Sequence, residues 1–112
     1  MARHDIFRAR GSTRILKITA SAAEAFTADA SNYHTFTVRH VRGTQTTGEL
    51  VGTAYSLDTR SLVVNEPVTL YADSAGLAMS DGERLALYLT ETGSPSALQG
   101  LEVWVEDQQI VR

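Results

Sequence analysis

The sequence predicts an all-β protein, an antiparallel β-sandwich. Residues 84–90 alternate strictly, with leucines on one side (Leu85, Leu87, Leu89) and mostly larger or polar side chains on the other (Arg84, Ala86, Tyr88, Thr90). Alternation of this kind is typical of a strand with one buried face. Six or seven further short segments follow at spacings of about 10 to 15 residues, each bounded by turn residues, which is typical of an antiparallel sandwich or barrel. The first half of the chain is also rich in Thr, Ser and Tyr, which favour strands.

The size of the chain fits one domain. Its 112 residues lie within the usual range for a single domain, and a chain of this length buries roughly two-thirds of its unfolded surface on folding. There is no cysteine, which excludes disulfides and thiolate metal sites and favours synthesis in the cytoplasm. No apolar run is long enough to span a membrane, and the first ten residues lack the apolar segment of a signal peptide.

The first half of the chain divides into an arm and three segments. Residues 1–12 show no clear period and end at Gly11-Ser12, which predicts an extended N-terminal arm preceding a domain over 13–112. Residues 13–20 predict a strand. Residues 21–31 fit two helical turns capped by Ser21, or an irregular or extended segment around Phe26; the neighbouring strands favour the second. Residues 32–42 predict a strand, followed by a loop.

The second half predicts four or five more strands. Residues 49–57 form the first, weakened at Gly52, and residues 61–65 and 68–72 form two short strands on either side of Pro67. Residues 73–82 are rich in turn residues and predict a connection. Residues 84–91 and 101–106 form the last two strands, separated by a loop that contains Pro95.

The charges are unevenly distributed along the chain. Residues 1–17 carry five positive groups and one negative group, a balance of +4, whereas residues 18–112 carry five positive and twelve negative groups, a balance of −7. A basic arm therefore precedes an acidic body. Nine of the ten cationic side chains are arginines, which suit fixed contacts with carboxylates better than lysine does.

No constellation of residues predicts catalysis, and we expect no catalytic residue, no cofactor and no metal. His34 and His40 share one face of a strand but lie about 20 Å apart, too far to share a metal ion, which favours solvent-facing or interface positions. Glu102, Glu106 and Asp107 lie near one another without the pattern of a calcium loop. Asp29 and Asp73 fit turns in which the carboxylate accepts local backbone hydrogen bonds.

Two features predict protein contacts instead. The arm combines arginines with neighbouring apolar side chains, which a solvated tail would not need, and this predicts a partner-binding segment made of Arg3, Ile6, Phe7, Arg8, Arg10 and Arg14. Nucleic acid is a weaker alternative because the acidic body repels phosphates. Trp104 falls on the polar side of its strand, between two glutamates, and predicts a strand buried on both faces or a tryptophan in a protein interface.

Two stretches carry a resemblance to a known family. Thr27, Ala28, Asp29, Asn32, Tyr33, Thr37 and Val38 match a "T-A-D-x-x-N-Y-x-x-x-T-V" pattern, and Gly82, Glu83, Leu85, Leu87, Thr90 and Gly93 match a "G-D-x-L-x-L-x-x-T-x-x-G" pattern, with Glu83 replacing the aspartate. Over residues 18–106 the chain thus resembles the small virion proteins that decorate or cement the heads of tailed bacteriophages. The resemblance implies a β-sandwich, often of jelly-roll type, bound to the outer face of a capsid, and implies no catalytic residue.

Taken together, these features predict a non-enzymatic virion structural protein on the capsid exterior, made in the bacterial cytoplasm. Its expected partners are the major capsid protein and copies of itself in a dimer or trimer. The alternatives are a tail, fibre or baseplate module, a carbohydrate-binding sandwich, and a small cupin-like enzyme. The last would need histidines and a glutamate inside a barrel, which the spacing of His34 and His40 does not provide.

Overall fold

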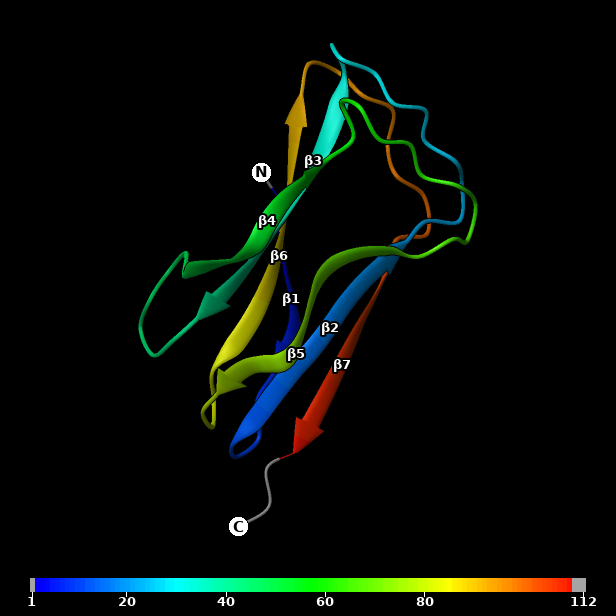
Figure 1. Ribbon diagram of the computed structural model, residues 1–112. Coiled ribbons are helices and arrows are strands. Elements are labelled where there is room, and N and C mark those ends of the chain that lie inside the picture. The colour runs from blue at the N-terminus through cyan, green and yellow to red at the C-terminus, as the bar shows by residue number, and fades with distance from the viewer. Residues whose placement is uncertain (1, 110–112) are drawn as a thin grey trace.

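A computed structural model describes residues 2–109 of the chain. This part folds into seven strands without a helix (Figure 1): β1 (Ala2–Arg8), β2 (Thr13–Ser21), β3 (Tyr33–Val41), β4 (Glu49–Ser56), β5 (Val68–Met79), β6 (Arg84–Thr92) and β7 (Glu102–Gln109). The alternating segments at 13–20, 32–42, 49–57, 84–91 and 101–106 each correspond to one of these strands. The prediction of an all-β fold is confirmed.

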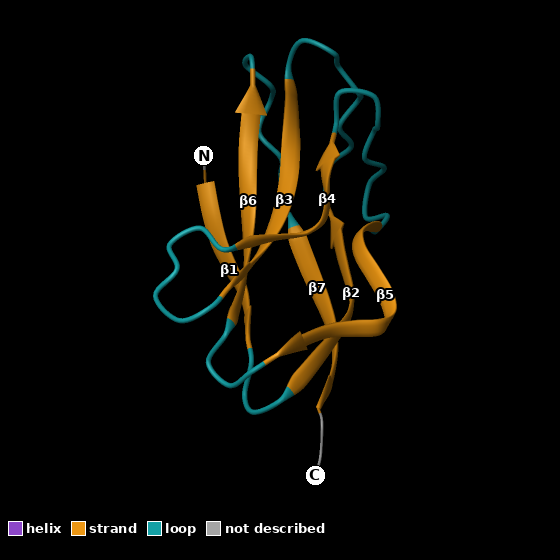
Figure 2. Ribbon diagram, turned by 60° about the vertical axis from the view of Figure 1, so that its left-hand side comes forward, coloured by secondary structure: helices purple, strands orange, loops and turns teal. Residues whose placement is uncertain are grey.

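The strands form two antiparallel sheets (Figure 2). The larger sheet has the order β1-β6-β3-β4 and the smaller sheet has the order β5-β2-β7. Across the interior, β1 faces β7 and β4 faces β5. The two sheets are therefore stacked face to face, with the edge strands of one lying over the edge strands of the other. The prediction of a two-layer sandwich is confirmed at this level.

The N-terminal arm is not confirmed. Residues 2–8 are β1, which pairs antiparallel with β6 from Ala2 opposite Leu89 to Arg8 opposite Arg84. A bulge between Asp5 and Phe7 hides the period-two pattern, because an inserted residue shifts the later side chains to the other face of the sheet. The segment thus belongs to the sandwich.

The jelly-roll topology is not confirmed either. A jelly roll places eight strands in two Greek keys, whereas residues 2–109 form seven strands, with β1 beside β6 and β2 between β5 and β7. Two local predictions were also wrong. Residues 73–79 continue β5 instead of forming a connection, and residues 61–65 form no strand.

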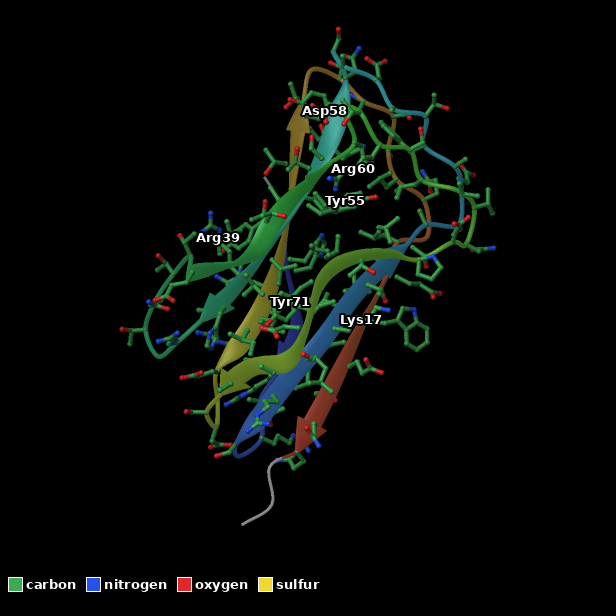
Figure 3. All side chains as sticks on the ribbon, viewed as in Figure 1. Lys17, Arg39, Tyr55, Asp58, Arg60 and Tyr71 are labelled. Atoms are coloured by element: carbon green, nitrogen blue, oxygen red, sulfur yellow. The ribbon has the colours of Figure 1, made fainter. Side chains whose placement is uncertain are left out.

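The segments at 21–31 and 57–67 are irregular and support one another. Phe26 and Leu62 form an isolated antiparallel bridge, and both side chains are buried, so the irregular interpretation of residues 21–31 is confirmed. Next to this bridge, the guanidinium carbon of Arg60 lies 4.5 Å from the centre of the Tyr55 ring (Figure 3), an attractive cation–π contact. These two connections close one end of the sandwich.

The core lies between the sheets and contains the leucines of the alternating strand β6. Leu85 and Leu87 are fully buried, together with Ile15, Ile18, Phe36 and Leu57. The opposite face of β6 is covered as well, since Ala86 and Tyr88 form a small second cluster with Val41. The β3–β4 loop lies over this cluster, and its carbonyl groups accept hydrogen bonds from the outer face of the sheet, from Arg84 to Gly43 (3.2 Å) and from Tyr88 to Thr46 (3.4 Å).

Candidate protein-contact face

The outer face of the smaller sheet presents one large aromatic side chain, Trp104. It is 64% exposed, the highest value among the exposed large hydrophobic residues of the described chain. Its neighbours on β7, Val103 and Val105, point inward and pack against the core, so alternation along the strand fixes the indole on the outside. The expectation that Trp104 is exposed in a position suited to an interface agrees with this geometry, whereas burial on both faces of the strand is excluded.

The residues around Trp104 come from all three strands of the smaller sheet. On β2, Thr19 lies opposite Trp104 and Lys17 lies opposite Glu106; Lys17 is labelled on β2 in Figure 3. A shallow groove of about 520 Å³ runs beside the indole and is lined by Lys17, Thr19, Pro67, Thr69, Trp104, Val105 and Glu106. We call this region the Trp104 face.

The electrostatics of the Trp104 face are mixed. Arg14 and Lys17 extend along β2, and Glu102 and Glu106 extend along β7 in the neighbouring register positions. A surface with interspersed charges of both signs does not attract phosphates over its whole area, as a nucleic-acid site does. An aromatic centre with a polar, charged rim is instead the arrangement found in protein interfaces.

Three of the six predicted contact residues of the N-terminal segment make contacts with other parts of the same chain. Arg3 donates a hydrogen bond to the Thr46 carbonyl (2.6 Å), lies 3.1 Å from Asp5 and sits over the Tyr88 ring. Ile6 and Phe7 pack against the core between the sheets. Their role in binding a partner stays a prediction, but the structure places them in the β1 strand of a sheet, not in a free arm.

The other three arginines of this segment are exposed. Arg8 ends β1, Arg10 lies in the β1–β2 connection, and Arg14 lies on β2 with its side chain over Gly76. Arg14 shares the sheet of the Trp104 face, two register positions from the lysine that lines the groove. The structure thus separates the predicted set into three residues with contacts inside the molecule, of which Arg3 is still exposed, and three further exposed arginines.

A second hollow lies between the sheets and had no signal in the sequence. This cleft of about 910 Å³ is lined by residues of β1, β3, β6, β7 and the connection before β7: His4, Ile6, His34, Leu87, Leu89, Thr90, Glu91, Ala97, Leu98, Leu101 and Val103. Because β1 and β7 are the facing edge strands of the two sheets, the cleft lies along that edge. Its lining comes from four separate stretches of the chain, which only the tertiary fold brings together.

The two strand histidines are buried, contrary to the expectation of solvent-facing or interface positions. His34 and His40 are 4% and 3% exposed. The His34 ring lies 2.7 Å from the Ser96 carbonyl oxygen and against the edge of Phe26, and the His40 ring lies 2.7 Å from the Glu83 carboxylate. Each histidine therefore has its own partner, and the two serve to join different elements.

The acidic residues do not gather into a metal site in the part of the chain described. Among residues 2–109, no group of three or more His, Asp or Glu side chains is placed to hold a metal ion. Asp29 accepts hydrogen bonds from the amides of Ser31 and Asn32, and these bonds lower the pKa of its carboxyl group. Asp73 likewise accepts from the Ala75 amide, so the prediction that Asp29 and Asp73 cap local backbone is confirmed.

The fold and this face define a small two-sheet β-sandwich with an exposed tryptophan on the outer face of one sheet. No family model, no curated protein and no solved structure matches the chain. Residues 2–109 contain no helix with the length and apolar character to cross a membrane.

Proposed function

We propose that this chain is a non-enzymatic virion structural protein that decorates the outer surface of a bacteriophage capsid. The Trp104 face is the surface that contacts the major capsid protein in this proposal. The observation that supports it is the indole of Trp104, which is 64% exposed on the outside of a sheet, where a structural role in the core is excluded.

The chemistry of the face fits a protein partner. Tryptophan and arginine are the side chains that most often dominate the energy of protein interfaces, where they fill pockets surrounded by a polar rim. Here the indole supplies the centre, Lys17 and Glu106 supply a rim of both signs, and Arg14 extends the rim along β2. Charges of both signs fix the orientation of the docked partner more than they add affinity.

The face is small, so attachment would depend on several copies acting together. One tryptophan and a shallow groove provide weak binding, but copies held in a dimer or trimer bind through a raised effective concentration. The capsid offers many equivalent sites at regular spacing. Location on the exterior of the virion and the absence of enzymatic activity both belong to this proposal.

Co-sedimentation with capsids tests the proposal. The purified protein is mixed with shells assembled from the major capsid protein encoded in the same genome, and the bound fraction is measured on a density gradient. We expect Trp104→Ala to lose at least tenfold in affinity, as hot-spot truncations commonly do. Leu50→Ala is the matched control, since Leu50 is 49% exposed on the edge strand β4, and it should bind as the unmodified protein does. Absence of binding by the unmodified protein would overturn the proposal.

A carbohydrate-binding sandwich, as in a tail or fibre module, is the second candidate. An exposed indole beside a groove with a carboxylate and a hydroxyl, such as Glu106 and Thr19, also fits a sugar ring. A glycan array separates the two candidates. Binding to a defined glycan that Trp104→Ala abolishes would favour the second, and a protein that binds capsids but no glycan would favour the first.

A further inference from the structure

We propose that strand β7 pairs with β7 of a second copy of this chain, forming a two-fold dimer. Within the described residues β7 pairs only with β2, so the backbone groups on its other side face outward. Such an edge is a template for another strand. Antiparallel pairing of two β7 strands would join the three strands of each copy into one sheet of six.

The other three edge strands are poor alternatives. β1 carries a bulge between Asp5 and Phe7, and register shifts also interrupt the pairing of edge strand β5 with β2 and of edge strand β4 with β3; bulges of this kind block edge pairing in natural sheets. In contrast, β7 pairs with β2 from Glu102 to Gln109, and the only register shift lies in β2, between Ile15 and Lys17. Among the four edge strands, β7 is therefore the one best able to continue into a neighbour.

The inner face of β7 is incompletely covered in a single copy. Leu101, Val103 and Val105 are only partly buried, although they point toward the core, and the cleft of about 910 Å³ lies directly behind the first two. On the central strand β2, the residues opposite Val103 and Val105 are Ala20 and Ile18, and both are fully buried. A strand added beside β7 would cover this side of the cleft and bury apolar surface, which favours association.

The charges of β7 select one register for the dimer. A pairing centred on Val105 places Glu102 opposite Gln108 of the second copy, Val103 opposite Asp107 and Trp104 opposite Glu106, with no two carboxylates facing each other. A pairing centred on Trp104 would oppose Glu102 and Glu106, and one centred on Glu106 would oppose two copies of that residue; like charges directly opposite destabilise a sheet. A pairing centred on Val103 would engage only the first three residues of the strand. The complementarity of β7 to itself is the reason for choosing a second copy as the partner.

The dimer would place two Trp104 faces on the same side of one continuous sheet. The two-fold axis lies perpendicular to the sheet, so both outer faces keep the same orientation. This arrangement provides a bivalent contact surface, but the dimer does not depend on the capsid proposal. Its tests need only the purified protein, so the two proposals can fail separately.

The oligomeric state and designed cross-links test the dimer. Analytical ultracentrifugation of the full chain should give twice the mass of one chain. Because the chain has no cysteine, single cysteines report pairing directly: Val105→Cys should form a disulfide-linked dimer on mild oxidation, since directly opposite residues lie at a distance that suits a disulfide. A mixture of Glu102→Cys and Gln108→Cys should cross-link, whereas each variant alone should not. Thr53→Cys, exposed on edge strand β4 and away from β7, is the control and should form no disulfide-linked dimer under the same oxidation.

Adding a negative charge at residue 108, and then removing one at residue 102, tests the register without changing the inner face of the strand. Gln108→Glu sets two like-charge pairs in each dimer and should raise the dimer dissociation constant roughly fivefold, and adding Glu102→Gln should restore it. Each variant is checked for an unchanged thermal unfolding midpoint at a concentration where it is monomeric. A monomer at all concentrations would overturn the proposal, and so would a dimer in which neither Val105→Cys nor the Glu102→Cys and Gln108→Cys mixture cross-links.

Discussion

The imidazole Nε2 of His40 lies 2.7 Å from Oε1 of Glu83, and this partly buried pair joins strand β3 to the turn that precedes β6. The same carboxylate oxygen accepts a hydrogen bond from the amide of Ser80 (3.1 Å). The side chain of His40 is 3% exposed and that of Glu83 is 19% exposed. One carboxylate thus satisfies a buried ring nitrogen and the backbone of the turn that positions the central strand β6.

This pair predicts a loss of stability in acid. Partial burial raises the pKa of Glu83, but the hydrogen bonds from Ser80 and His40 and the attraction of His40 and Arg42 outweigh it, so the pKa lies below its ordinary value of 4.5. Because the unfolded chain binds this proton more readily, the contribution is present above pH 4.5 and is lost as the pH falls through the folded-state pKa. Urea unfolding of the unmodified protein and of Glu83→Gln at several pH values measures it. The difference between the two should shrink in acid, and a constant difference would contradict the prediction.

The His40–Glu83 pair also predicts how far two substitutions of Glu83 lower the free energy of unfolding at neutral pH. Glu83→Ala leaves the buried nitrogen of His40 without an acceptor and should lower the free energy of unfolding by about 2 kcal/mol. Glu83→Gln keeps an oxygen acceptor and should cost about 1 kcal/mol. Glu66→Gln, on an exposed loop, is the control and should change stability by less than about 0.5 kcal/mol. Equal effects of all three substitutions would rule out a role for the pair.

Arg3 is predicted to hold the β3–β4 loop on the outer face of the larger sheet. Its guanidinium donates to the Thr46 carbonyl and lies 5.8 Å from the centre of the Tyr88 ring. Arg3→Ala should lower the free energy of unfolding by about 1 kcal/mol and speed hydrogen exchange of the amides of residues 42–48. Arg10→Ala, which removes an exposed side chain, should do neither. Unchanged exchange in Arg3→Ala would show that the loop is held by other contacts.

Deletion of residues 1–12 should destabilise the protein instead of leaving an intact domain. The deletion removes β1 with its half-buried Ile6 and Phe7, removes the fully buried Ala9 that follows β1, and uncovers one edge of β6. Loss of two large apolar side chains from a core costs roughly 3 kcal/mol or more. Thermal unfolding measures the effect, and the double variant Arg8→Ala with Arg10→Ala is the control that keeps β1. A truncated chain as stable as the full chain would restore the interpretation of this segment as an arm.

Substitution of two glycines with left-handed backbone conformation, Gly82 and Gly93, measures the cost of backbone strain separately from the cost of steric conflict. Gly82 has φ +83° and open space where an added methyl group would lie, whereas at Gly93, with φ +69°, a Cβ atom would collide with the Ser31 carbonyl oxygen and lie 2.5 Å from Asn32 Oδ1. Gly82→Ala should therefore cost about 1 kcal/mol from backbone strain alone. Gly93→Ala should cost at least about 2 kcal/mol, because it also disturbs the hydrogen bond from the Ser94 amide to Asn32 (2.8 Å). Equal costs in urea unfolding would contradict this ordering.

Trp104 is the only tryptophan of the chain, so tryptophan fluorescence directly measures the solvent exposure of the Trp104 face. Its exposure predicts an emission maximum typical of indole in water and efficient quenching by acrylamide, with no change in stability on substitution by phenylalanine. Binding of a protein partner over the face should shift the emission to shorter wavelength and reduce quenching. A blue-shifted, protected indole in the dilute, monomeric protein would contradict the assignment of Trp104 to an open face.

The alternating strands could be predicted from the sequence because burial on one face selects residue types locally. Leu85 and Leu87 lie in the core as their spacing indicates, and Asp29 caps a turn as its neighbours indicate. At each of these positions, side-chain chemistry and local backbone geometry point the same way. The position of Trp104 between two glutamates left open whether its strand is buried on both faces, and the structure places the indole on the outside.

Several parts of the site depended on contacts that are distant in the sequence. The bulge at Asp5–Phe7 masked the period of β1, so this segment was predicted to be a partner-binding arm. Pairing with β6 instead packs Ile6 and Phe7 against the core. His34 and His40 carry no local signal of burial, because their partners Ser96 and Glu83 are 62 and 43 residues away. The cleft between β1 and β7 has no signal in any one segment.

The sequence by itself determined the class of the fold and the strands with one buried face, since period-two burial is a property of each segment alone. The tertiary structure decided which arginines bind backbone distant in the sequence, where the histidines find partners and which strand edge stays open. Those outcomes depend on the free energy of pairing groups from different strands, and a linear pattern of residues does not contain that information.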